Sequence, residues 1–260
     1  MGKRIAVFLF GVVSYVLFFG TFLYAVGFVG NLVVPKAIDG EPVMPVLQAL
    51  LINAGLLGVF AVQHSVMARK GFKRWITQFI PQAAERSVYV ACASLALILM
   101  FTQWQPMGGS VWTVELPFAS GILYAMFGLG WTIVLVTTFL INHFDLFGLR
   151  QVWLYLSGRE YRPLQFRTPG PYRMVRHPLY LGFLLAFWAT PTMTVAHFLF
   201  AIATTGYILV AIQLEERDLV SDHGRLYERY REFVPMIVPS MKNRTLQDMS
   251  EVRHYVVNDR

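Results

Sequence analysis

Long uncharged apolar stretches alternate with short charged ones along the whole chain. Five stretches contain no Asp, Glu, Lys or Arg, namely residues 5–29, 46–67, 87–103, 118–141 and 179–214. A helix needs about 20 apolar residues to cross a hydrocarbon core of about 30 Å, and the first four stretches have 17 to 25 residues each. The pattern therefore predicts an all-α, polytopic integral membrane protein in which each of these four stretches crosses once.

The fifth stretch is too long for one crossing and too short for two full ones. Its 36 residues would form a helix of about 54 Å, whereas two full spans need about 40 residues and a turn. Pro191 lies in the candidate turn, residues 189–194, because proline cannot continue a helix without losing a hydrogen bond. We therefore predict a helical hairpin with a short first arm as the fifth membrane segment.

Basic residues gather in alternate connections between these stretches. Residues 68–86 contain five Lys or Arg and residues 142–178 contain six, whereas residues 104–117 contain none. Because cytoplasmic loops carry an excess of Lys and Arg, we expect both termini and both basic connections on the cytoplasmic side. This topology requires the hairpin to begin and end on that same side.

Composition supports a single membrane domain over residues 1–260. The chain is 56% apolar and 14% charged, against roughly 25% charged for soluble domains. We expect four spans within residues 5–141, a cytoplasmic loop at 142–178, the hairpin at 179–214, and a cytoplasmic tail with a helix at 215–260. The net charge of +7 is assigned to the loops rather than to nucleic-acid binding, and the single cysteine, Cys92, excludes a disulfide framework.

Three of the six histidines are predicted to lie at one depth, near the cytoplasmic boundary. His64 is near the inner end of the second span, His143 follows the fourth, and His177 precedes the hairpin. Polar groups at membrane depth are costly and tend to line a cavity or a site. Each histidine alone is as readily an interfacial residue, but three together favour a site.

Residues 170–182 form an aromatic and cationic lead-in to the hairpin. Pro178 suits the first turn of a helix, where free backbone N–H groups favour an anion, and Arg176 and His177 add donors. Beyond the hairpin, the adjacent carboxylates Glu215 and Glu216 need a cationic partner. That partner is either a nearby arginine or the ammonium and sulfonium groups of a ligand.

These elements together resemble the isoprenylcysteine carboxyl methyltransferase-like superfamily. The resemblance covers roughly residues 170–239 and consists of Arg-His-Pro-x-Tyr-x-Gly (176–182), Glu-Glu (215–216), and Gly-x-x-Tyr-x-x-Tyr (224–230) ahead of Val-Pro (234–235). It implies an S-adenosylmethionine pocket closed by the C-terminal tail. The residues that would hold this cofactor are Tyr172, Arg176, His177, Tyr180, Leu181, Glu215, Glu216 and Tyr230.

A closer resemblance extends over most of the chain. Residues 63–69 (QHSVMAR) and 142–151 (NHFDLFGLRQ) look like the bacterial methanethiol S-methyltransferases. This resemblance implies conversion of methanethiol to dimethyl sulfide at a bacterial inner membrane. NnrU-like proteins, which have no settled activity, share part of the pattern.

Methyl transfer to a thiol requires alignment, desolvation and a thiolate. An alkyl thiol, like cysteine with its pKa of about 8.5, is mostly protonated at neutral pH, so a base near 7 would help. His143 is the first choice, and Asp145 either orients it or pairs with Arg150. His64 is the rival base, or a second wall of the thiol site.

Two alternatives stay open. The same fold could methylate a larger lipid-like thiol, carboxylate or amine. A non-enzymatic, NnrU-like protein could instead use the histidines to bind haem or a metal, although the sequence has no repeated histidine spacing on one helix and we expect no metal. The oligomeric state is also left open.

Overall fold

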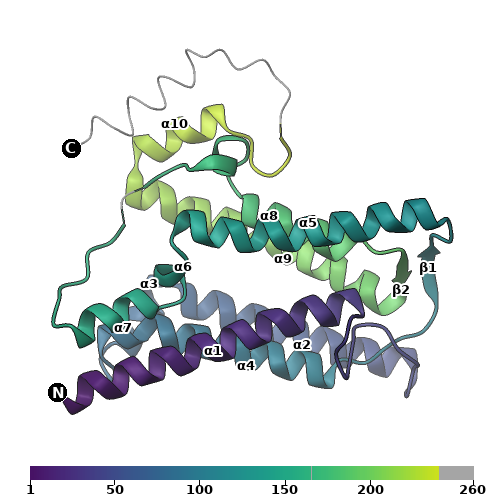
Figure 1. The fold of residues 1–260 in the computed structure, drawn as a ribbon, viewed down its shortest axis with the longest axis horizontal. Helices are drawn as coiled ribbons and strands as arrows, with labels where there is room; N and C mark the ends of the chain where they lie inside the picture. Colours follow the sequence, from purple (N-terminus) through teal and green to yellow (C-terminus); the bar gives the residue numbers. More distant parts are fainter. Residues whose placement is uncertain (165, 240–260) are drawn as a thin grey trace.

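Five long helices run side by side in the part of the chain that the computed structural model describes, residues 1–164 and 166–239 (Figure 1). They are α1 (Gly2–Gly30), α2 (Val46–Ala68), α4 (Glu85–Gln103), α5 (Pro117–Ile141) and α9 (Val195–His223). Each of the five is long and apolar enough to cross a membrane. The predicted class, an all-helical multi-pass membrane protein, is confirmed.

The shorter elements gather at the two ends of this bundle. The N-terminal end carries the chain start with α3 (Lys70–Ile76), α6 (His143–Leu146) and α7 (Leu149–Leu156), and α10 (Arg225–Phe233) lies above it (Figure 1). Two 3-10 turns, η1 (Gln82–Ala84) and η2 (Gly170–Arg173), precede α4 and the hairpin. The opposite end, called the ribbon end below, carries β1 (Ser110–Thr113) and β2 (Thr192–Thr194).

The fifth segment is the predicted hairpin. Its short arm, α8, begins at Pro178 and ends after 11 residues at Trp188, which is about 16 Å of helix and roughly half of the hydrocarbon core. The chain turns through residues 189–194 and returns as α9, which continues through the acidic pair to His223. The described part of the predicted tail ends at residue 239, and residues 240–260 lie outside the described residues.

Two glycines allow α8 to pack directly on α5. A Cβ atom on Gly130 would lie 2.7 Å from the carbonyl oxygen of Gly182, and a Cβ on Gly182 would lie 2.7 Å from that of Gly130. Such close backbone approach is how helices associate in lipid, where van der Waals packing replaces the hydrophobic effect. The glycine that ends the Arg-His-Pro-x-Tyr-x-Gly motif is therefore explained by helix packing.

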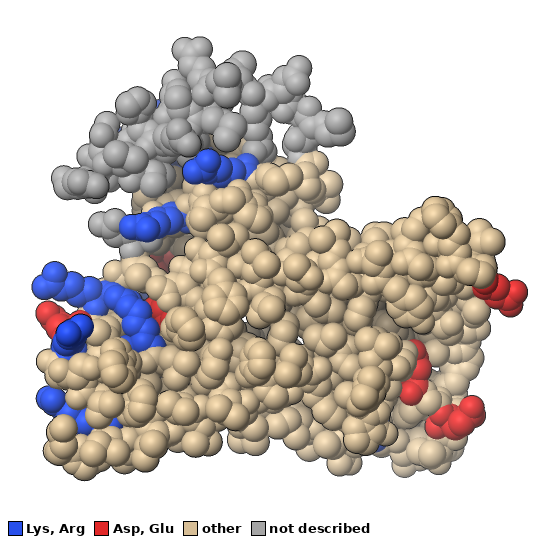
Figure 2. All heavy atoms as spheres, in the orientation of Figure 1, with Lys and Arg blue, Asp and Glu red and all other residues tan. Residues whose placement is uncertain are grey.

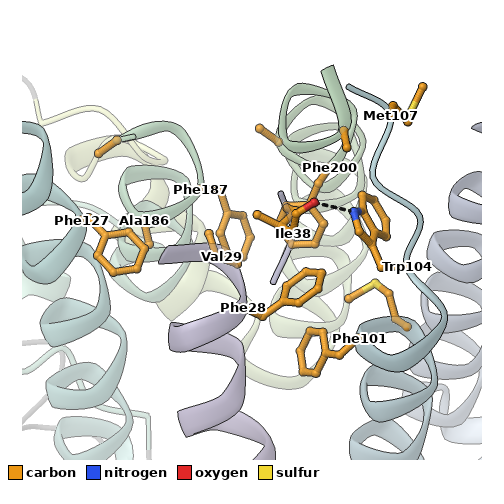
Figure 3. Packing of buried hydrophobic residues seen from close by; sticks show 14 of the residues in the cluster. Phe28, Val29, Ile38, Phe101, Trp104, Met107, Phe127, Ala186, Phe187 and Phe200 are labelled. Carbon is orange, nitrogen blue, oxygen red and sulfur yellow. Dashed lines mark hydrogen bonds between the residues drawn. The ribbon is translucent and has the colours of Figure 1, made fainter. Parts of the chain in front are cut away.

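Aromatic side chains fill the core toward the ribbon end. Phe28, Ile38 and Trp104 are fully buried there, and the Trp104 indole donates a hydrogen bond of 3.1 Å to the Ile38 carbonyl (Figure 3). The rings of Phe28 and Phe101 lie 4.7 Å apart, and that of Phe200 meets Trp104 edge-on at 5.9 Å. This packing joins the loop after α1 to α4 and α9.

The small β-ribbon was not predicted. β1 and β2 pair in antiparallel fashion, and the Trp112 indole donates to the Thr190 carbonyl at 3.1 Å. Three- and four-residue strands carry no clear alternation of polar and apolar positions, so the sequence gives no signal for them. The ribbon ties the connection before α5 to the hairpin turn.

A partly buried carboxylate fastens the loop after α1 to that same turn. Asp39 accepts hydrogen bonds from Asn31, at 2.6 Å, and from the Thr194 hydroxyl, and lies 3.8 Å from the ring of the fully buried His197. Burial raises the pKa of Asp39, but His197, Thr194 and Asn31 together outweigh burial and hold the pKa below its usual value. The ionised form is therefore the one that locks the ribbon end.

We predict that Asp39→Asn lowers stability by about 1–3 kcal/mol, the range for losing charge-assisted hydrogen bonds. Because the folded pKa lies below the unfolded value of about 3.9, this contribution is present above about pH 4 and is lost as the pH falls through the folded pKa. Thermal midpoints of the detergent-solubilised protein at pH 7 and pH 3 measure both effects. Glu41→Gln, on an exposed residue of the same loop, is the matched control, and equal midpoints for the two variants at pH 7 would refute the lock.

Candidate active site

The carboxylate of Glu216 is the centre of a buried charge network at the N-terminal end of the bundle. Glu216 is 5% exposed, and its Oε1 atom accepts from Arg176 Nε at 2.7 Å and lies 3.0 Å from His177 Nε2. Arg231 Nε lies 3.4 Å from the other carboxylate oxygen. A buried carboxylate is tolerated only when it is paired and hydrogen-bonded in this way. The network thus joins the lead-in before α8 to α9 and α10.

Residues 234–236, which follow α10 and are called the strap below, are held against the same lead-in by hydrogen bonds to their carbonyls. The amides of Arg176 and His177 donate to the carbonyls of Pro235 and Met236 at 2.8 and 3.1 Å. Arg176 Nη1 donates to the Val234 carbonyl at 2.6 Å. Arg176 therefore serves both Glu216 and the strap, so its guanidinium has little freedom to move.

Glu215 has a different environment from its neighbour. It is half-buried, and within the described residues Tyr180 supplies its one hydrogen bond, at 2.9 Å. Burial first, and then the negative charge of Glu215, raise the pKa of Tyr172. Tyr227 also lies within electrostatic reach of Glu215. A carboxylate beside tyrosine rings is suited to a cation, which both the charge and the ring faces attract.

An open cleft of about 340 Å³ lies beside the Glu216 network, lined by Arg176, Glu228, Arg231 and Glu232. That volume is within the range of about 300–1,000 Å³ for small-molecule sites. The lining carries two positive and two negative side chains. The cleft can therefore receive a ligand that carries both charges.

Two further residues of the predicted set make packing contacts. The Tyr230 hydroxyl donates to the Tyr172 carbonyl at 2.5 Å, and its ring is buried in an aromatic cluster with Tyr227. Leu181 packs against Ile212 and Ile237. Both side chains hold the lead-in, the hairpin and the strap together around Glu215.

His143 is buried and fully hydrogen-bonded. It is 2% exposed, with Tyr15 Oη 2.9 Å from Nε2 and Thr138 Oγ1 2.8 Å from Nδ1. Its ring stacks on Phe139 at 4.2 Å, and burial lowers its pKa, so the ring is neutral at pH 7. The Asp145 carboxylate lies instead 2.7 Å from Arg150, so Tyr15 and Thr138 orient His143 in this structure.

His64 lies half-buried where α2, α4 and α9 meet. The Tyr89 hydroxyl is 2.8 Å from Nε2 and 3.1 Å from Nδ1 of the imidazole. Phe60 stacks on the ring at 5.1 Å, and Tyr207 stands edge-on at 6.5 Å. The Tyr207 hydroxyl in turn lies 3.2 Å from that of Ser65, the residue after His64.

The three histidines therefore occupy three environments instead of one common cluster. His177 contacts Glu216, His64 contacts Tyr89, and His143 contacts Tyr15. His64 lies near the end of α2, His143 directly follows α5, and His177 precedes α8. These places agree with the expectation that all three lie at one end of the bundle.

Comparison with curated proteins identifies close relatives over nearly the whole chain. Methanethiol S-methyltransferase of Crocosphaera subtropica is 58% identical over 237 residues, 91% of this chain and 93% of the relative. That of Mycobacterium tuberculosis is 53% identical over 237 residues, 91% of this chain and 97% of the relative. The chain belongs to the methanethiol S-methyltransferase family. The resemblance noted in its motifs is thereby confirmed.

A more distant relative matches about two thirds of the chain. Nurim of Bos taurus is 30% identical over 183 residues, 67% of this chain and 69% of nurim. Searches with family models and against solved structures return no match. As a methyltransferase, the chain must hold a methyl donor, and the carboxylates, tyrosines and cleft around Arg176 are the groups available for it.

Sequence reasoning missed Tyr89 and Tyr207 as site residues. Both lie inside apolar helices, where a tyrosine is more often a core or interfacial residue. Neither belongs to a motif on which the resemblance to the methanethiol S-methyltransferase family rests. Their position beside His64 becomes apparent only when α2, α4 and α9 are assembled.

Proposed function

We propose that the protein transfers the methyl group of S-adenosylmethionine to methanethiol and forms dimethyl sulfide. The main support is that the chain is 58% and 53% identical, over 91% of its length, to two proteins named methanethiol S-methyltransferase. The geometry around Glu215 and Arg176 agrees with a ligand that carries both positive and negative groups. The second candidate, methylation of a larger lipid-like substrate, has no comparable support.

The side chains present fit S-adenosylmethionine. When bound, this cofactor supplies an electrophilic methyl group on a positively charged sulfur. Glu215, with one hydrogen bond from Tyr180, is available to a cationic group, and the nearby tyrosines Tyr172 and Tyr180 are residue types that attract cations. Arg231, on the cleft wall, contacts Glu216 through Nε at 3.4 Å, so we assign its Nη groups to the cofactor's carboxylate. Arg176 and His177 are committed to Glu216 and act by fixing the shape of the site.

We assign the thiol proton to His64 in preference to His143. Tyr89 lies between the two ring nitrogens of His64, so a small ring rotation frees one nitrogen to accept a proton. Both nitrogens of His143 are already bonded to hydroxyl groups. His64 would hold the thiol proton at that nitrogen, and the bound cofactor would supply the methyl group to the thiolate. His143 then has a structural role at the junction of α1 and α5.

We also propose that the N-terminal end of the bundle is cytoplasmic in a bacterial inner membrane. Lys and Arg gather at that end, whereas the ribbon end displays mainly Asp and Glu (Figure 2). This asymmetry follows the positive-inside bias. With this orientation, Glu215, the cleft and His64 would lie on the side where S-adenosylmethionine is made.

A reporter fused at Gly109 should report the outside and one fused at the C-terminus should report the cytoplasm. The reason is that residues 104–117 contain no Lys or Arg, whereas the N-terminal end is basic. Paired phosphatase and fluorescent-protein fusions measure both positions. Equal signals would mean that α8 and α9 do not return to the side from which they start.

Glu215→Gln should weaken S-adenosylmethionine binding about 10- to 100-fold while leaving thermal stability near wild type. Loss of a charged hydrogen-bond acceptor typically costs about 1.5–3 kcal/mol. Calorimetric titration of the purified protein measures the affinity. Glu216→Gln is the matched control from the next position, and we expect it to lower the thermal midpoint because Arg176 loses its buried charged partner. Wild-type affinity in Glu215→Gln would remove Glu215 from the cofactor site.

His64→Ala should lose about 10²- to 10⁴-fold in turnover at pH 7 with unchanged S-adenosylmethionine affinity, as expected for loss of a general base. Raising the pH should restore part of the rate, because more thiol ionises without help. Dimethyl sulfide formation across pH 6–10 measures this recovery. His143→Ala is the comparison variant. It should have a lower thermal midpoint, and any loss of turnover should be the same at every pH. The reverse pattern in the two variants would make His143 the base.

A further inference from the structure

Tyr207 lies against His64, the residue to which we assign the thiol proton. Its ring lies 6.5 Å from that of His64 and 6.2 Å from that of Phe60, edge-on to both. It belongs to α9, the helix that also carries Glu215. Tyr207 therefore forms a wall on the thiol side of the site.

Its place on α9 explains this position. Tyr207 precedes Glu215 by eight residues on one continuous helix, which corresponds to about 12 Å along the axis and slightly more than two turns. Both side chains consequently lie on similar sides of α9, facing α2 and α8. A small thiol that reaches His64 therefore meets the Tyr207 ring on the side toward α9.

The ring is also held in place. The Tyr207 hydroxyl lies 3.2 Å from the hydroxyl of Ser65 on α2, and Phe60, one turn earlier on the same helix, packs against it. A ring fixed at its tip and along its edge cannot swing aside to admit a longer chain without losing these contacts. It therefore sets a fixed boundary to the space beside His64.

The surrounding surface is apolar. Val62 and Val66 flank His64 on α2 and are 64% and 48% exposed, as expected for side chains that face lipid. His64 and Ser65 are partly buried directly beneath them. An uncharged alkyl thiol dissolved in the bilayer meets no charged side chain of α2 at this point, so the limit on substrate size must come from the residues deeper in the site.

We propose that Tyr207 is the specificity-determining residue that restricts the acceptor to a thiol with a very small alkyl group. This inference rests on the proposed thiol methylation and names the residue that selects within that substrate class. A pocket wall that rejects one additional methylene typically discriminates by about 10- to 200-fold. Removal of the ring should therefore admit ethanethiol and 1-propanethiol at the expense of selectivity.

The test compares kcat/KM for methanethiol, ethanethiol and 1-propanethiol in wild type, Tyr207→Ala and Tyr207→Phe. In Tyr207→Ala the ratio of 1-propanethiol to methanethiol should rise at least about tenfold. Tyr207→Phe keeps the ring and loses only the hydroxyl bonded to Ser65, so its ratio should stay close to wild type. Tyr124→Ala, which removes the same group from an exposed position of α5, is the matched control and should leave the ratio unchanged.

An unchanged ratio in a folded Tyr207→Ala protein would overturn the inference, because a merely structural tyrosine would lower all three rates together. Tyr207→Leu, which retains more apolar volume, provides the same comparison if the alanine variant does not fold, and an unchanged ratio there has the same meaning. Failure of the proposed function itself has a different signature. In that case the wild-type protein methylates none of the three thiols with S-adenosylmethionine.

Discussion

The pairing of Glu216 with Arg176 and His177 is the interaction on which the candidate site depends. A buried carboxylate in a protein this apolar has a high desolvation cost, and only closely placed cationic donors can offset it. Meeting that requirement brings the lead-in, α9 and α10 together, with the strap after α10 bonded to the lead-in backbone. Once Glu216 is fixed, the neighbouring Glu215 is set among the tyrosines, with its carboxylate available. Glu216 thus holds the elements of the site together, and we infer that Glu215 binds the cofactor.

Hydrogen-bond satisfaction is also what separates the two histidines considered as bases. A general base must present a ring nitrogen to the substrate. At His143, Tyr15 and Thr138 occupy both nitrogens and Phe139 covers the ring, whereas at His64 one hydroxyl is shared between the two nitrogens. His64 also lies edge-on to Tyr207 of α9, the helix that carries Glu215. These contacts favour His64 as the general base and a structural role for His143.

Most of the architecture was predictable from the sequence, because bilayer thickness translates directly into the lengths of uncharged stretches. The hairpin followed from a stretch of unsuitable length with Pro191 about a third of the way along it, and α8 begins at Pro178 as expected. The superfamily was recognisable from local motifs at 176–182 and 215–216, and the family from residues 63–69 and 142–151. The β-ribbon carried no periodic signal. The side-chain pairings around the histidines were hidden because their members come from distant parts of the chain: Tyr15 and His143 are 128 positions apart, and Ser65, next to His64, is 142 positions from Tyr207. Such pairings arise from helix packing, which composition and spacing do not specify.

The central claim is that a methyl group passes from S-adenosylmethionine to methanethiol within this one protein. Its most direct test supplies the purified protein in lipid vesicles with methanethiol and S-adenosylmethionine whose transferable methyl group is deuterated, followed by mass spectrometry of the headspace. The account predicts dimethyl sulfide that carries one deuterated methyl group per molecule, formed in equal amount to S-adenosylhomocysteine. Cofactor consumption without labelled dimethyl sulfide, or no consumption of the cofactor at all, would contradict it.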